Sequence, residues 1–302
     1  MNYVALFTGQ GSQFAGMGRE LHEHAQQARA TLEAADRILP GLLELCFEGP
    51  EEELVRTENT QPCVLAVDVA AYRAFGHTPA IAAGHSLGEY AALVAAGGLG
   101  LEDALPLVVA RAKAMQAAVP EGTGGMVALL RMSEEEARRA AAEVKSGVCE
   151  LANLNAPGQY VMSGEIAAMH ELVERFGRRQ AVLLPVSVPF HSSMLSDAAA
   201  DFAQRLKAVE LRDAAFPVVS NFDAQPRSGA EDLRSALERQ FAASVLWQPS
   251  IEYLLGAGHR DFIEFGPKPV LTKMVDQIAK AADVAVNAKS VTRADDLEGA
   301  RT

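Results

Sequence analysis

Two short apolar segments, each running into a glycine turn and then a helical pattern, constrain the fold of this chain most. Residues 3–7 (YVALF) end at the turn TGQG, and residues 79–83 (PAIAA) end at the turn GHSLG. Helical patterns follow the two turns, at about 16–37 and 87–96. Strands that alternate with helices predict a mainly parallel β-sheet covered by helices, and therefore an α/β fold.

The pattern changes between residues 124 and 186. This segment reads as a strand, a helix, two strands joined by the turn NAPG, a second helix and a fourth strand. The order βαββαβ is that of a ferredoxin-like unit. Since 302 residues exceed one ordinary domain, we expect a large α/β domain formed by 1–123 and 187–288 with a small domain inserted at 124–186. The polar residues 289–302 are expected to form a loose tail.

Composition excludes several functional classes. A net charge of −12 argues against a general nucleic-acid-binding protein, which needs a basic surface for the phosphates. No run of 18 or more apolar residues is present, so no membrane-spanning helix is expected. The first residues lack the basic segment of a signal peptide, and Cys46, Cys63 and Cys149 show no CxxC spacing. We therefore expect free thiols and a cytoplasmic protein.

The turn GHSLG (84–88) carries the strongest candidate for a catalytic group. The pattern Gly-x-Ser-x-Gly between a strand and a helix is typical of a nucleophile elbow, whose glycines make room for a sharp turn. Ser86 would stand at the N-terminal end of the following helix, where free amides and the helix dipole stabilise an oxyanion. The alternative is a Gly-Ser-Gly turn without chemistry, but the position between strand and helix favours a nucleophile.

A nucleophilic serine needs a base, and the chain offers seven histidines. Five of them lie in exposed segments or directly beside the serine, where neighbouring side chains point apart. His191, just past a buried strand, and His259, in a polar loop late in the chain, remain. The residue order of an ordinary α/β-hydrolase favours His259, whereas the partly desolvated surroundings expected of a base favour His191. No acid is marked as the third member of a triad, and a backbone carbonyl could instead accept the Nδ1–H.

Two further polar residues are candidates for contacts with a substrate. Gln10 lies between the glycines of the first turn, where it could bring an amide donor to an oxyanion; a turn residue without a role is the alternative. Arg111 lies on or beside the apolar face of a predicted helix at 102–119. A partly buried guanidinium is costly unless it meets an anion, so we expect a salt bridge to Glu102 or Asp103, or a fork for a substrate carboxylate.

With these residues the chain resembles the malonyl-CoA:acyl carrier protein transacylases, which include the enzyme of fatty-acid synthesis and the free-standing acyltransferases of polyketide synthesis. The resemblance extends over nearly the whole chain and implies a hydrolase-like large domain with an inserted ferredoxin-like domain. It is carried, in the family's order, by FTGQGSQ (7–13), ENTQP (58–62), GHSLGEY (84–90), ARAKAMQAAVPEGTGGM (110–126), NLNAPGQYVMSG (153–164), VSVPFHSSM (186–194) and FIEFGPKPVLT (262–272).

The resemblance implies a role for each candidate. Ser86 is expected to be the acylated nucleophile and His191 its base. Arg111 is expected to grip the free carboxylate of malonate. The backbone amides of Gln10 and Leu87 are expected to form the oxyanion hole.

The same resemblance implies roles for further positions. Leu246, which precedes the single tryptophan, is expected to offer its main-chain carbonyl to the catalytic histidine. Asn155 and Gln159 are expected near the thioester and the pantetheine arm. Phe190 leaves little room for an α-methyl branch, which predicts malonyl over methylmalonyl by about 1–3 kcal/mol. Thr8 is common in polyketide acyltransferases, so the pathway stays open between fatty-acid and polyketide synthesis.

The expected reaction is a ping-pong transfer with malonyl-CoA as substrate and with no metal or bound cofactor. The expected partner is a phosphopantetheinylated acyl carrier protein; no nucleic-acid or membrane partner is expected, and a monomer is the working expectation. Carrier proteins of this family are typically acidic, so docking should use basic residues near the cleft between the domains. The candidates are Arg131, Arg138, Arg139, Arg178 and Arg179.

Two other functions fit parts of the same pattern. A serine acyl hydrolase would send the acyl group to water, but an editing hydrolase that removes neutral acyl chains has no use for Arg111. A non-catalytic scaffold that binds a carrier protein has no need of an intact Ser86 and His191. The sequence therefore favours the transferase.

Overall fold

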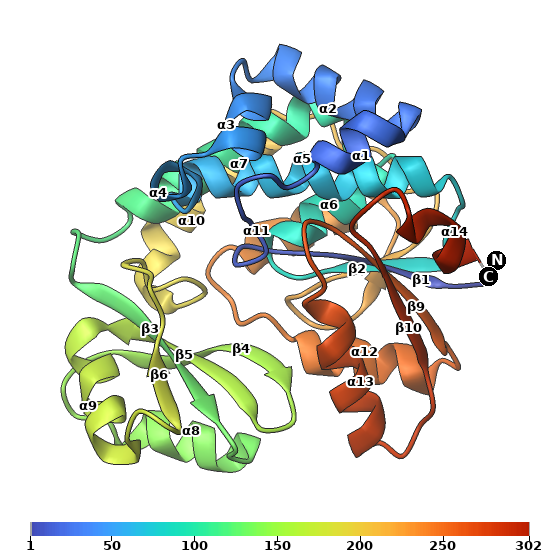
Figure 1. Cartoon of the computed structure of the whole chain (residues 1–302). Helices are drawn as coiled ribbons and strands as arrows, with labels where there is room; N and C mark the ends of the chain where they lie inside the picture. The colour runs from blue at the N-terminus through green and yellow to red at the C-terminus, as the bar shows by residue number, and fades with distance from the viewer. Residues whose placement is uncertain (1, 302) are drawn as a thin grey trace.

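The computed structural model of the chain describes residues 2–301, and a six-stranded sheet forms the centre of its larger part (Figure 1). The strands are β1 (Val4–Phe7), β2 (Ile81–Gly84), β7 (Val218–Val219), β8 (Pro226–Arg227), β9 (Asp261–Phe265) and β10 (Asn287–Val291). Their order is β10-β9-β1-β2-β7-β8, with parallel pairing throughout except for β8, which runs antiparallel to β7. The predicted α/β class is confirmed.

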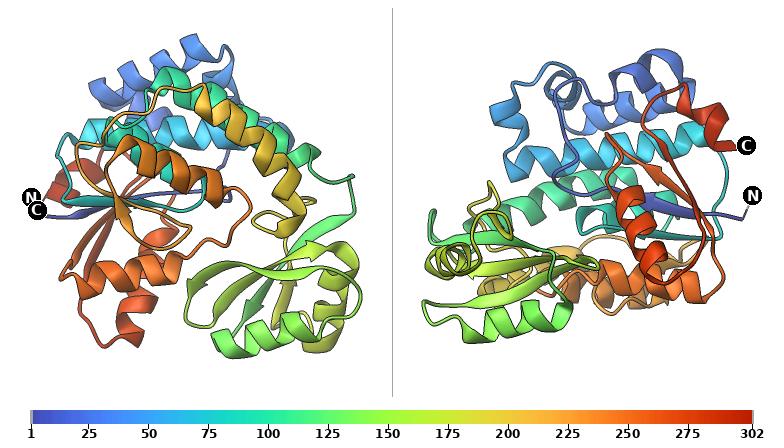
Figure 2. Two further views of the ribbon diagram at one scale, coloured as in Figure 1. Left: turned by 180° about the vertical axis from the view of Figure 1, so that it is seen from behind. Right: turned by 60° about the horizontal axis from the view of Figure 1, so that its bottom comes forward.

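Helices cover both faces of this sheet, and the alternation of side chains along β1 explains why (Figures 1 and 2). Tyr3, Ala5 and Phe7 enter one apolar core, while Val4 and Leu6 enter another on the opposite face. The first core takes in α2 (Gln26–Ile38), α5 (Thr57–Phe75), α6 (Leu87–Ala95), α7 (Leu101–Ala117), α10 (Ser196–Lys207) and α11 (Ala230–Gln240), and the second takes in α12 (Trp247–Gly256) and α13 (Leu271–Ala281). The remaining helices are short: α1 (Arg19–His24), α3 (Leu42–Glu48), α4 (Glu51–Leu54), the 3₁₀ turn η1 (Ser193–Leu195) and α14 (Asp296–Arg301).

A four-stranded antiparallel sheet forms the smaller part of the molecule, beside the carboxyl ends of β1 and β2 (Figure 1). Its elements are β3 (Gly124–Leu130), α8 (Glu134–Glu143), β4 (Cys149–Ala156), β5 (Gln159–Glu165), α9 (Ile166–Phe176) and β6 (Ala181–Leu183). The strand order β4-β5-β3-β6 with this βαββαβ sequence confirms the ferredoxin-like insertion. The residue bounds of the two domains stay predictions.

The prediction of a loose tail from residue 289 is wrong. Residues of β10 pair with β9 at the edge of the large sheet, Val291 opposite Phe265, and α14 follows. Arg301 donates a hydrogen bond to the carbonyl of Phe75 at 2.9 Å, and Val291 and Ala300 are buried. An edge strand has a neighbouring strand on one side only, so it can be partly exposed to solvent and polar. The sequence NAKSV of β10 therefore lacks the apolar run that predicted the central strands.

Neither a membrane span nor a metal cluster occurs among residues 2–301. No helix in that range is both long and apolar enough to cross a membrane. No group of three or more His, Cys, Asp or Glu side chains in the same range could hold a metal ion.

Candidate active site

Ser86 stands on a strained turn between β2 and α6. Its backbone has φ 52° and ψ −99°, a conformation that costs free energy and is found where the surrounding structure enforces it. A Cβ on Gly84 would lie 2.0 Å from the carbonyl carbon of Gly88, and a Cβ on Gly88 would lie 2.1 Å from the carbonyl oxygen of Phe7. The two glycines of the motif are therefore required for the helix to approach the strands, as the elbow pattern predicted.

Asn221, which follows β7, holds this turn from the neighbouring strand. Its Oδ1 accepts the Ser86 N–H at 2.6 Å, and its Nδ2 donates to the Gly84 carbonyl at 2.7 Å. The side chain is buried, so each of these bonds is protected from water. Asn221 could not be predicted from the sequence, since an asparagine 135 residues from the serine carries no local signal.

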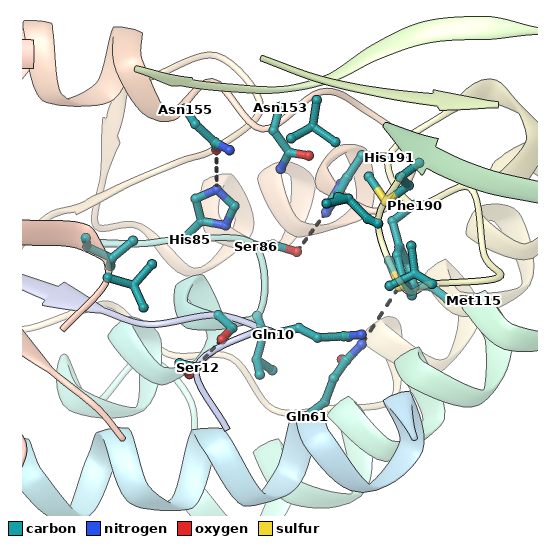
Figure 3. Close-up of a pocket in the computed structure, with 18 of the residues that line it drawn as sticks. Gln10, Ser12, Gln61, His85, Ser86, Met115, Asn153, Asn155, Phe190 and His191 are labelled. Carbon is teal, nitrogen blue, oxygen red and sulfur yellow. Dashed lines mark hydrogen bonds between the residues drawn. The ribbon is translucent and has the colours of Figure 1, made fainter. Parts of the chain in front are cut away.

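His191 faces the serine (Figure 3). Its Nε2 lies 2.7 Å from Ser86 Oγ, and its Nδ1 lies 3.0 Å from the carbonyl oxygen of Ala243 and 3.2 Å from that of Gln240. Two carbonyl acceptors keep the ring proton on Nδ1 and leave the lone pair of Nε2 directed at the serine hydroxyl. Of the two histidines left open by the sequence, His191 is the one placed here; His259 does not line the pocket described below.

The prediction that Leu246 supplies the orienting carbonyl is wrong. That carbonyl lies at the start of α12, where it accepts the Ser250 N–H at 3.0 Å and the Ser250 hydroxyl at 2.7 Å. The helix therefore turns it away from the imidazole. The loop between α11 and α12 offers Ala243, three residues earlier, in its place.

Burial keeps the His191 imidazole neutral. The side chain is 5% exposed, and burial, followed by the nearby charge of Arg111 and by His85, lowers its pKa from 6.5 to about 3. A neutral imidazole can accept a proton at physiological pH. This ring is therefore in the state required of a general base.

Arg111, on α7, brings a buried cation to the serine. Its side chain is 1% exposed, and one terminal nitrogen donates to Ser86 Oγ and to Gln240 Oε1, each at 3.0 Å. The other terminal nitrogen donates to Gln61 Oε1 at 3.0 Å, and the Tyr90 ring lies 5.2 Å below the guanidinium. No carboxylate within residues 2–301 forms an ion pair with Arg111, so the alternative of a salt bridge to the start of α7 is not realised.

A buried acid is linked to this cation through an amide. Gln240 Nε2 donates to the Ser86 carbonyl at 2.8 Å and to Glu89 Oε2 at 3.0 Å, while its Oε1 faces Arg111. Burial raises the pKa of Glu89 to about 7, although hydrogen bonds and Arg111 oppose the shift. Gln61, Glu89 and Gln240 were not predicted as site residues. Gln61 and Glu89 lie in the motifs ENTQP and GHSLGEY, whereas no sequence motif contains Gln240.

Two backbone amides lie near the serine from adjacent turns. Leu87 begins α6, and Gln10 follows β1, which is the parallel neighbour of β2. Gly9 lets the turns approach, because a Cβ there would lie 2.5 Å from the His85 carbonyl oxygen. Neither the Leu87 nor the Gln10 amide has a hydrogen-bond partner in the described chain, so both can receive an oxyanion.

One pocket between the two sheets is lined by Gln10, Ser86, Leu87, Arg111 and His191 (Figure 3). Asn155 lines it and holds His85 through a 2.8 Å contact between Oδ1 and Nε2, and Phe190 lines it beside His191. Gln159, the first residue of β5, does not line the pocket, whereas Val161 of the same strand does. Asn153, which also lines the pocket, was not predicted.

The basic residues considered for docking a carrier protein are all on the surface: Arg131, Arg138, Arg139, Arg178 and Arg179. Arg138 and Arg139 form ion pairs of 2.7 Å with acidic residues of α8. Arg138 also lines a second groove, which reaches His191. Of the five arginines, Arg138 is therefore the one that shares a groove with His191.

Known proteins are similar to this chain over nearly its whole length. The model of the acyl transferase domain family matches residues 4–297. The malonyl CoA-acyl carrier protein transacylase of Bacillus subtilis (strain 168) is 41% identical over 282 residues, which are 90% of this chain and 89% of that protein. The acyl-carrier-protein-S-malonyltransferase of Bartonella henselae superposes with a TM-score of 0.94 at 37% identity, covering 99% of this chain and 98% of the other. A malonyl-transacylase in complex with a type II PKS acyl-carrier protein matches with a TM-score of 0.94 at 37% identity and covers 99% of both chains.

Proposed function

The chain belongs to the acyl transferase domain family, and we propose that it transfers the malonyl group of malonyl-CoA to the phosphopantetheine thiol of an acyl carrier protein. The observation that carries the proposal is the buried Arg111 cation, which has no carboxylate partner in the described chain and lies 3.0 Å from Ser86 Oγ. One methylene separates the two carbonyl carbons of malonate, so an acyl carbon bound at the serine leaves its carboxylate beside the guanidinium. Arginine binds such a carboxylate through two parallel hydrogen bonds.

In the first half-reaction the serine is acylated. His191 Nε2 takes the proton of Ser86 Oγ, and the alkoxide attacks the thioester carbonyl of malonyl-CoA. The tetrahedral oxyanion is received by the Gln10 and Leu87 amides. When it collapses, the C–S bond breaks and the imidazolium returns its proton to the departing CoA thiolate, leaving a malonyl ester on Ser86.

In the second half-reaction the same groups act in reverse order. His191 takes the proton of the carrier's thiol, and the thiolate attacks the malonyl ester. The C–O bond to Ser86 breaks, and the serine oxygen recovers the proton from the imidazolium. Throughout, the carbonyls of Ala243 and Gln240 stabilise the charged ring, because the Nδ1–H points at both oxygens.

The partner and setting follow from the same proposal. A structural neighbour of this chain is in complex with an acyl-carrier protein, and Arg138 beside the second groove could meet an acidic carrier here. The free thiols of Cys46, Cys63 and Cys149 support a reducing compartment such as the cytoplasm. We also propose that the protein is a monomer and serves fatty-acid or polyketide synthesis.

Intact mass spectrometry after incubation with malonyl-CoA alone tests the reaction. The expected result is a stable increase of one malonyl group, absent in Ser86→Ala, which a holo carrier protein then removes while becoming malonylated. Release of free malonate without a lasting adduct would show a hydrolase. An adduct that persists in Ser86→Ala would contradict the assignment of the nucleophile.

A further inference from the structure

A chain of hydrogen bonds lies behind the turn that contains Gln10. The Thr8 hydroxyl oxygen lies 2.8 Å from Asp68 Oδ1 on α5 and 3.0 Å from the Ser12 hydroxyl oxygen. The Ser12 hydroxyl oxygen lies 2.8 Å from the carbonyl oxygen of Gly9. The first turn of the sheet is thus connected to a buried carboxyl that the transfer mechanism does not use.

The three contacts of this hydrogen-bond network need three hydrogens, and the Thr8 and Ser12 hydroxyls supply only two. The Gly9 carbonyl can only accept, so the Ser12 hydroxyl spends its hydrogen there. An ionised Asp68 would accept the Thr8 hydrogen at Oδ1 and leave the contact between Ser12 and Thr8 without a hydrogen. All three contacts are hydrogen bonds only if a third hydrogen is present. Asp68 can supply it only as a protonated carboxylic acid.

The surroundings of Asp68 favour that neutral form. Its side chain is fully buried, its Oδ2 has no hydrogen-bond partner in the described chain, and the buried Glu264 of β9 lies nearby. A Cβ on Gly266 would lie 2.8 Å from Asp68 Oδ1, so the backbone after β9 closes this space. Burial raises the pKa of Asp68 well above its usual value, against the opposing effect of Thr8, and Glu264 raises it further.

At its other end, the hydrogen-bond network fixes the Gly9–Gln10 peptide of the active site. The Gly9 carbonyl accepts the Ser12 hydroxyl and also the Ser12 N–H at 3.3 Å. This carbonyl and the Gln10 N–H belong to one planar peptide and point in opposite directions. Holding the carbonyl from behind therefore directs the Gln10 N–H forward, into the pocket that Gln10 lines with Ser86.

We propose that Asp68 is a neutral carboxylic acid that positions the oxyanion-hole amide of Gln10 through Thr8 and Ser12. Asp68 does not touch the substrate; it is a positioning residue. The proposal rests on the proposed function, since it assigns Gln10 to the oxyanion of the acyl transfer. It concerns the tetrahedral intermediate and not the binding of malonyl-CoA, so it predicts an effect on the acylation rate and none on affinity.

The test is the rate of malonyl-Ser86 formation, followed by quenched intact-mass spectrometry over a range of malonyl-CoA concentrations. Thr8→Val and Ser12→Ala should each lower the saturating acylation rate by about tenfold and leave the half-saturating malonyl-CoA concentration unchanged. The loss is smaller than the factor of about 10²–10³ in kcat that removal of an oxyanion donor costs, because the Gln10 amide is displaced and not removed. Asp68→Ala should show the same loss. Asp68→Asn should keep most of the rate, because its amide can donate the third hydrogen to Thr8.

A matched control separates this effect from general loss of a buried hydroxyl. Thr31→Val removes a buried hydroxyl that bonds the Gln27 carbonyl at 2.9 Å on α2, and it should leave the acylation rate unchanged. Full rates in both Thr8→Val and Ser12→Ala, or an Asp68→Asn variant as slow as Asp68→Ala, would overturn the proposal.

A second measurement does not depend on activity. The infrared difference spectrum of wild type minus Asp68→Asn at neutral pH should contain the carbonyl stretch of a protonated carboxylic acid; a carboxylate signal in its place would overturn the proposal. A wild-type protein that forms no malonyl adduct would instead refute the proposed function, and the infrared result would still decide the state of Asp68.

Discussion

Replacing Arg111 by alanine tests why a cation is buried beside Ser86. In the malonyl complex the guanidinium can make two charged hydrogen bonds to the substrate carboxylate, worth about 1.5–3 kcal/mol each. One of its nitrogens already contacts Ser86 Oγ and Gln240 Oε1, so part of this gain replaces existing bonds. Taking about 3 kcal/mol as the net loss, and 1.36 kcal/mol for each factor of ten, kcat/KM for malonyl-CoA should fall by about 10².

Acetyl-CoA provides the comparison, because it offers the same thioester without a carboxylate. With acetyl-CoA bound, wild-type Arg111 stays unpaired in a dry site, and Arg111→Ala removes that cost. The ratio of kcat/KM for acetyl-CoA to that for malonyl-CoA should therefore rise by about 10² or more in the variant. Arg111→Lys keeps the charge but not the planar fork, and should fall between the two proteins.

Equal losses on both substrates would refute this reasoning. Such a result would mean that Arg111 acts by holding Gln61 and Gln240, whose oxygens it satisfies at 3.0 Å each. Thermal unfolding of the variant distinguishes that outcome from simple destabilisation, since each buried acceptor left without a donor costs about 1–3 kcal/mol. A folded variant with unchanged substrate preference would remove the carboxylate clamp from the mechanism.

Three more predictions concern His191, Phe190 and the surface that docks the carrier protein. The folded protein lowers the pKa of His191 from 6.5 to about 3, so below pH 6.5 the unfolded chain binds a proton that the folded chain does not bind. The stability measured by thermal unfolding should therefore decline as the pH falls below 6.5, and it should decline less in His191→Gln. The same pH dependence of stability in both proteins would contradict the neutral ring. Phe190→Ala should raise the preference for methylmalonyl-CoA over malonyl-CoA by about tenfold, measured as a ratio of kcat/KM, and an unchanged ratio would show that Phe190 does not exclude the methyl branch. Arg138→Glu should raise the KM for the carrier protein and leave acylation by malonyl-CoA alone unaffected; an unchanged KM would place the docking surface elsewhere.

What the sequence could predict were features that depend on near neighbours in the chain. The elbow at Ser86 needs a strand, two glycines and a helix, all within one short segment. The βαββαβ order is likewise a succession of local patterns, and it led to the correct inserted fold. The edge strand β10 could not be predicted in this way. It pairs with β9 alone, so its sequence can be polar, and a polar sequence near the C-terminus predicted a loose tail.

The rest of the site is assembled by contacts across the sheet that leave no local trace. Asn221 reaches the Ser86 amide over 135 residues, and Gln240 reaches the Ser86 carbonyl over 154. Asparagine and glutamine are also common on protein surfaces, so the sequence around them does not show that these two side chains are buried at a site. The carbonyl that orients His191 depends on which way the backbone turns between α11 and α12, which explains the three-residue error that named Leu246 in place of Ala243.

The long-range partners have one property in common: at the positions closest to the serine they are neutral. Gln61 and Gln240 orient Arg111 with amide oxygens, and backbone carbonyls orient His191. A carboxylate in place of either glutamine oxygen would pair with the guanidinium, and a carboxylate at the imidazole Nδ1 would raise the pKa of His191. Dipoles hold both groups without neutralising them. The site therefore keeps a neutral imidazole and an unpaired guanidinium for a substrate that itself brings the carboxylate.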